Sequence, residues 1–125
     1  MTNYKTTELG KLDELIKLEN GKTFLHDLLE LTSCEISVNT VAKGFKVPFS
    51  HKHKQNEEVY IVLKGNGIIT VDGTPIEIKE GSAVKILPDA ARTIENTGEN
   101  ELQFICIQAK ENSLEQFGLA DAELC

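Results

Sequence analysis

The sequence predicts an all-β fold, and three patterns support this prediction. From about Cys34 onward, apolar and polar residues alternate with the period of two that is typical of half-buried strands. Turn residues interrupt the alternation at short intervals, as they do between antiparallel strands. No helical segment between the runs is long enough for a parallel crossover. The patterns together indicate an antiparallel sandwich or small barrel.

Six segments have the composition of strands, because β-branched or aromatic residues form short runs in each of them. The connections between them are rich in glycine, asparagine and aspartate, which tolerate the backbone of tight turns. Asp72-Gly73 is the strongest of these hairpin signals. The predicted strands are 35–41, 59–63, 67–71, 76–78, 83–87 and 102–107.

The two ends of the chain have weaker patterns. Residues 8–18 can be read as an amphipathic helix, but Gly10 and the lack of a capping box leave this open. Residues 23–31 favour one or two edge strands, and 113–117 favour the start of a short helix. We therefore predict a single domain with a strand or helix extension packed on the barrel (1–33), the barrel (34–112), and a tail or short helix (113–125).

Charge and composition narrow the function. Thirteen Lys and Arg residues against twenty Asp and Glu residues give a net charge of −7, which repels phosphate backbones and anionic lipid. No run reaches the about 18–20 apolar residues of a membrane helix, and the first residues lack the apolar core of a signal peptide. The three cysteines form no Cys-x-x-Cys pair and fit reduced thiols. We expect a cytoplasmic protein with no nucleic-acid or membrane partner.

Two of the three histidines, His51 and His53, are separated by a single residue. In an extended segment, residues i and i+2 point to the same face, so both imidazoles can converge on one ion. Glu58 follows at the start of a predicted strand and adds a carboxylate. Two imidazoles and one carboxylate suit Zn, Fe, Mn, Ni or Co and leave positions open for substrate or water. The alternative is that both histidines are solvated loop residues.

The pattern Gly44…His51-Lys-His53…Glu58…Gly65 resembles the first motif of the cupin superfamily. From His51 onward the spacing matches that motif, whereas the gap between Gly44 and His51 is one residue longer than usual. The second cupin motif resembles the series Gly81, Pro88 and Asn96. The resemblance implies a conical jelly-roll barrel that holds a divalent transition metal inside.

The resemblance also implies a fourth ligand, a histidine of the second motif, and here the chain departs from the family. Counting from Asn96 places Arg92 at that position, and counting from Pro88 places Thr93 there. Three outcomes stay open: a three-ligand metal site completed by water, a site completed by a substitute ligand, or a site without metal. The candidate substitutes are Gln55, Glu57, Gln103 and Cys106.

Further residues are candidates for binding a substrate. Arg92 either receives a carboxylate or phosphate in the barrel mouth or is a surface residue paired with Asp89 or Glu95. Tyr60 has the strand parity of Glu58, so its phenol either lines the cavity or packs in the barrel. Gln55 is the third candidate. The remaining candidates are structural: His26 beside Asp27 as a surface residue, Glu57 as a solvated neighbour of Glu58, and Cys106 as a packing residue of opposite parity to Gln103.

The first functional hypothesis is a small metal-dependent enzyme that acts on a small polar molecule. The reaction types that the resemblance implies include dioxygenation and isomerisation or epimerisation. The alternative hypothesis is a barrel that binds a metal or a small molecule without turnover. We also expect a homodimer, because a short chain with open strand edges often covers them by pairing.

Overall fold

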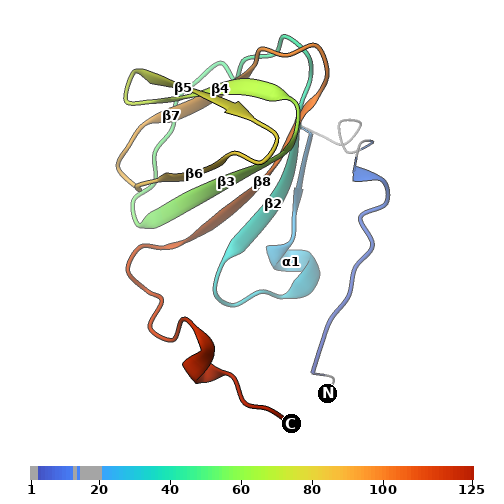
Figure 1. Cartoon of the computed structure of the whole chain (residues 1–125), viewed down its shortest axis with the longest axis vertical. Helices are drawn as coiled ribbons and strands as arrows, with labels where there is room; N and C mark the ends of the chain where they lie inside the picture. Colours follow the sequence, from blue (N-terminus) through green and yellow to red (C-terminus); the bar gives the residue numbers. More distant parts are fainter. Residues whose placement is uncertain (1–2, 13, 15–20) are drawn as a thin grey trace.

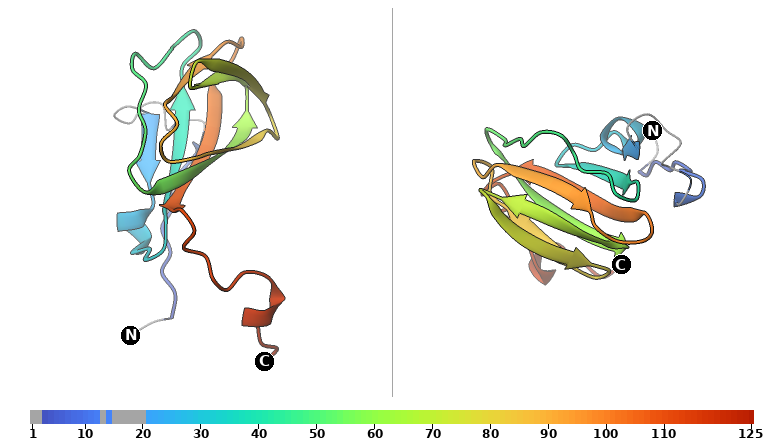
Figure 2. Two further views of the ribbon diagram at one scale, coloured as in Figure 1. Left: turned by 90° about the vertical axis from the view of Figure 1, so that its left-hand side faces the viewer. Right: turned by 90° about the horizontal axis from the view of Figure 1, so that it is seen from above.

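The computed structural model describes residues 3–12, 14 and 21–125. Two antiparallel sheets face each other (Figures 1 and 2), one with the order β1-β2-β8-β3-β6 and one with the order β5-β4-β7. The predicted all-β jelly-roll class is confirmed, although the described ladders remain two sheets and do not close into one ring. The elements are β1 (Lys22–Phe24), α1 (His26–Leu29), β2 (Glu35–Val41), β3 (Asn56–Lys64), β4 (Asn66–Val71), β5 (Thr74–Lys79), β6 (Ala83–Ile86), β7 (Arg92–Asn96), β8 (Leu102–Lys110) and the 3-10 helix Leu119–Asp121.

The ends of the chain correct two predictions. The expected edge strands over 23–31 shrink to β1, which pairs with β2, and the short helix α1 follows. A helix does not begin at 113–117, and a single 3-10 turn lies further along instead. Of the possible helix over 8–18, residues 13 and 15–18 lie outside the described residues, and residues 8–11 form no helix. None of the described helices is long and apolar enough to cross a membrane.

The hairpin between β4 and β5 confirms the strongest turn signal. Asp72 and Gly73 have φ angles of 48° and 83°, which suit a tight two-residue turn between paired strands. Because β4 also pairs with β7, its residue Ile69 is completely buried between neighbours. The core lies between the two sheets and contains Ile69, Ile78, Ile86, Ile94 and Leu102 together with residues of β3 and β8.

Alternation along β3 decides what enters this core. Glu58, Tyr60 and Val62 are buried, while the residues between them are half-buried. Antiparallel pairing sets Tyr60 opposite Cys106 and Val62 opposite Phe104 of β8, and these partners are buried too. The period of two therefore carries the Glu58 carboxylate into the interior along with Tyr60 and Val62.

Gly65 closes the first motif because no other residue fits there. Its φ is +91°, and a Cβ atom would lie 2.5 Å from the backbone oxygen of Glu101. We expect Gly65→Ala to lower the free energy of unfolding by about 1–3 kcal/mol, measured by urea denaturation. Gly73→Ala is the control, because Gly73 has a similar φ of +83° with open space around it. Equal losses in both variants would show that the close contact contributes nothing.

Candidate metal centre

The three predicted ligands come together where the buried Glu58 carboxylate meets the exposed side of the molecule. One donor atom from each of His51, His53 and Glu58 lies within 4.8 Å of the others. The Nε2 atom of His53 is 3.2 Å from Oε2 of Glu58, and the Nε2 atom of His51 is 4.0 Å from Oε1. The two imidazole rings meet edge to face, with centroids 5.2 Å apart. The donors therefore converge on one small volume.

Backbone hydrogen bonds fix the segment that carries both histidines. His51 pairs with Arg92 of β7, each donating its N–H to the carbonyl of the other at 3.1 and 2.9 Å. The N–H of His53 donates to the carbonyl of Pro88 at 2.8 Å. The second motif thus contributes to the site through its backbone, since Pro88 anchors one ligand and β7 anchors the other.

The Glu58 carboxylate is the shared partner of several polar side chains in the interior. Its Oε1 atom is 3.3 Å from Nη1 of Arg92 and accepts a hydrogen bond from the Tyr60 hydroxyl at 3.3 Å. Its Oε2 atom is 3.4 Å from the thiol of Cys106. Tyr60 is held in place by stacking on Phe104, with ring centroids 5.2 Å apart. The carboxylate is therefore held between one cation and two neutral donors.

The surroundings also set the protonation of these groups. Burial lowers the pKa of the His51 imidazole, with Arg92, His53 and Lys22 acting in the same direction and Glu58 against it. His51 is thus favoured in the neutral form that a metal requires. Burial, reinforced by the charge of Glu58, raises the pKa of the Tyr60 phenol and of the Cys106 thiol well above their usual ranges. Both groups therefore keep their protons.

The structure resolves which residue stands in the place of the second-motif histidine. Arg92 is 1% exposed and directed at Glu58, whereas Thr93 is half-buried and its hydroxyl donates to the carbonyl of Val47. Arg92 is therefore the residue in the ligand position. The alternative of a surface arginine is wrong, and Asp89 pairs with Lys52 at 3.1 Å instead.

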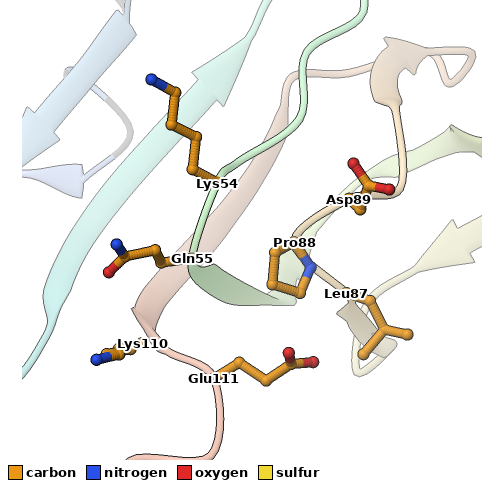
Figure 3. A pocket seen from close by; sticks show the side chains of 7 residues that line it. All are labelled: Lys54, Gln55, Leu87, Pro88, Asp89, Lys110 and Glu111. Atoms are coloured by element: carbon orange, nitrogen blue, oxygen red, sulfur yellow. The ribbon is translucent and has the colours of Figure 1, made fainter.

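The other candidates lie apart from the three ligands. Gln55 is exposed and lines a separate surface pocket of about 410 Å³ between the Pro88 loop and the end of β8, as Figure 3 shows. Gln103 is buried, but its amide donates to the Leu12 carbonyl. Cys106 reaches the Glu58 carboxylate whereas Gln103 does not, as expected for two residues on opposite sides of β8. His26 is half-exposed in α1 beside Asp27, as expected for a surface residue, and Glu57 is half-buried on the opposite parity to Glu58.

The donor set fits a divalent transition metal. Nε2 of His53 is buried without a hydrogen-bond partner among the described residues, although a buried ring nitrogen is normally satisfied. Two imidazoles and a carboxylate are also the ligands that zinc, iron and related ions take in proteins. The set is one ligand short of a four-residue site, because Arg92 brings a positive charge to the fourth position.

Comparison with known proteins identifies the family. The Cupin domain family model matches residues 37–108. The fold, the two motifs and this match show that the chain belongs to the cupin family. A cupin protein from Bacteroides fragilis is 38% identical, with a TM-score of 0.89 over 100% of this chain and 99% of its own.

Two further relatives have names that refer to small anions. The oxalate-binding protein of Thermotoga maritima is 33% identical over 57 residues, which are 46% of this chain and 47% of that protein. A protein of Acidithiobacillus ferrooxidans proposed to be a sugar phosphate isomerase is 27% identical, with a TM-score of 0.64 over 71% of this chain and 58% of its own. The match to the Thermotoga protein thus covers less than half of either chain.

Proposed function

We propose that this cupin is a small metal-dependent enzyme that acts on a small polar molecule, with chemistry of the dioxygenase or the isomerase and epimerase type. The observation that carries the proposal is the convergence of donor atoms from His51, His53 and Glu58 within 4.8 Å. A divalent ion held by three protein ligands supplies a Lewis acid with open positions for substrate. The metal is Zn, Fe, Mn, Ni or Co, all of which accept this ligand set.

The residues around the ligands support substrate binding at the same place. The side chain of His51 is 41% exposed, while that of Glu58 is 5% exposed, so the site is reached from the His51 side. Tyr60 and Arg92 flank the carboxylate as the groups that would contact a bound molecule. The relatives named for oxalate and for a sugar phosphate support a small polar substrate with negative charge.

A non-catalytic binding barrel is the second candidate function. It is favoured by the charge of Arg92, which occupies the place of the fourth ligand and is 3.3 Å from Glu58. A permanent cation there neutralises the carboxylate and weakens its attraction for a metal ion. The same barrel would then hold a small molecule through hydrogen bonds alone.

Metal content tests the proposal. The protein is purified without a tag, supplemented with each of the five ions, dialysed and measured by inductively coupled plasma mass spectrometry. We expect near-stoichiometric metal in the wild type and loss of most of it in His51→Ala and His53→Ala. His26→Ala is the matched control, because this histidine is half-exposed in α1 beside Asp27. Absence of metal from the wild type after supplementation would overturn the enzyme proposal and leave the binding barrel.

Three further expectations stand as proposals. A homodimer is supported by the open edges of β1 and β6 in the five-stranded sheet. Analytical ultracentrifugation that finds only a monomer would contradict it. A cytoplasmic location is supported by the three free cysteines. The division into 1–33, 34–112 and 113–125 is supported by the bounds of β2 and β8, although β1 of the extension joins the main sheet.

A further inference from the structure

Arg92 is a buried cation with unused hydrogen-bond donors. Its side chain is 1% exposed, and its Nη2 atom donates to the carbonyl of Leu87 at 2.6 Å. Its Nε and Nη1 atoms make no hydrogen bond among the described residues. Nη1 lies on the Glu58 side, at 3.3 Å from that carboxylate. Buried charged donors are normally hydrogen-bonded, so the unpartnered Nε and the Nη1 that has only an ion pair indicate that a further acceptor can bind here.

The charges of the site indicate the sign of that acceptor. Glu58 carries one negative charge and Arg92 one positive charge, so the pair is balanced. A divalent ion held by the three ligands would therefore leave the site with two uncompensated positive charges. In an interior of low dielectric constant, excess charge of this size strongly favours an anionic ligand.

A second cation faces the same interior from β1. Strand pairing sets Lys22 opposite Asn39, and Asn39 opposite Phe104, which is part of the core. Lys22 is therefore on the inward side of its strand. Lys22 is exposed, so solvent screens its charge more than that of Arg92.

The residues next to Arg92 and Glu58 are largely apolar. Ile86 lies opposite Glu58 in the β3–β6 ladder, and Ile94 is two positions from Arg92 on the same side of β7. Because these neighbours are buried and Arg92 itself is 1% exposed, a compact anion is favoured over a bulky one. A carboxylate can also accept from a guanidinium and bind a transition metal through its oxygens.

We propose that the interior site takes a small organic carboxylate and that Arg92 is the residue that receives it. This inference rests on the proposed function and names its substrate class. Arg92 then acts as the anion receptor beside the metal ligands, and Lys22 adds long-range attraction.

Isothermal titration calorimetry on zinc-loaded protein tests the inference. The probes are oxalate, acetate, inorganic phosphate and oxamide, the uncharged diamide with the shape of oxalate. We expect the two carboxylates to bind and oxamide not to bind. Arg92→Gln should weaken oxalate binding by about ten- to a hundredfold, Arg92→Lys by less, and Lys22→Gln by only a few-fold. Metal content is measured in every sample after the titration, and circular dichroism checks that each variant is folded.

The controls separate the ways in which the inference can fail. Lys54→Gln changes a cation of the surface pocket in Figure 3 and should leave oxalate binding unchanged. Full oxalate affinity in metal-loaded Arg92→Gln and Arg92→Lys would overturn the role of Arg92. Preference for phosphate, or binding of oxamide as tight as that of oxalate, would overturn the substrate class. If the wild type takes up no metal, the enzyme proposal fails by itself. Arg92-dependent oxalate binding to the metal-free protein would then still support the anion receptor, and its absence would overturn it.

Discussion

Removal of the Glu58 carboxylate is expected to lower the free energy of unfolding of the metal-free protein by about 3–5 kcal/mol. Glu58 is 4% exposed and Arg92 is 1% exposed, so Glu58→Ala leaves a buried guanidinium without its counter-charge. The Tyr60 hydroxyl and the Cys106 thiol lose their acceptor in the same step. Urea denaturation in the presence of a chelator measures this loss without any contribution from bound metal.

Two further variants show whether the ion pair is the cause. Glu57→Ala removes a carboxylate one position away, on the half-buried opposite side of β3, and should change stability by less than about 0.5 kcal/mol. The double variant Glu58→Leu with Arg92→Met replaces both charges and should recover most of the stability, because no unpaired charge remains. A Glu58→Ala protein as stable as Glu57→Ala would show that water reaches Arg92 and that the pair contributes little.

The strands and the three ligands could be predicted because their signals are local. The period of two in 35–41 reproduces β2 residue for residue, and the turn at Asp72-Gly73 follows from two positions with positive φ. The spacing of His51, His53 and Glu58 is likewise a property of a short segment. In the fold, pairing of that segment with β7 brings the donors together. The pattern can nevertheless be recognised from the sequence without knowing this pairing.

The environment of the ligands could not be predicted in this way. β7 was missed because two of its three buried positions, Arg92 and Asn96, are residue types that usually lie at the surface. Asn96 is buried because its amide donates to the carbonyls of Val41 and Asn100. Arg92 is buried because it pairs with the Glu58 carboxylate of another strand. Both residues therefore depend on a partner that is distant in the sequence, Val41 for Asn96 and Glu58 for Arg92. Gln55 was a candidate ligand and substrate-binding residue, yet it is exposed and lines the surface pocket instead.

The substitution Arg92→His is expected to tighten metal binding by about a hundredfold. Residue 92 is hydrogen-bonded to His51 through the backbone, and its side chain is directed at Glu58, so a histidine there would complete a four-ligand set. Structural zinc held by four ligands has a binding free energy of about 10–16 kcal/mol, which is about 3 kcal/mol per ligand and about a hundredfold in dissociation constant. Arg92→His also removes a positive charge that opposes the ion.

Competition against a chromophoric chelator measures the zinc dissociation constants of the wild type and of Arg92→His. Thr93→His is the matched control, because the Thr93 side chain turns toward the Val47 carbonyl and should bring no gain in affinity. Tighter binding in Thr93→His alone would contradict the placement of Arg92 in the ligand position.

The Arg92→His variant should also lose stability without metal, since Glu58 then lacks its partner, and regain it on metal binding. If the free energy of unfolding depends on metal in Arg92→His and much less in the wild type, Arg92 takes the place of an ion in stabilising the interior. Arg92 would then lower the affinity of the site for metal and provide an anion receptor beside the open coordination positions.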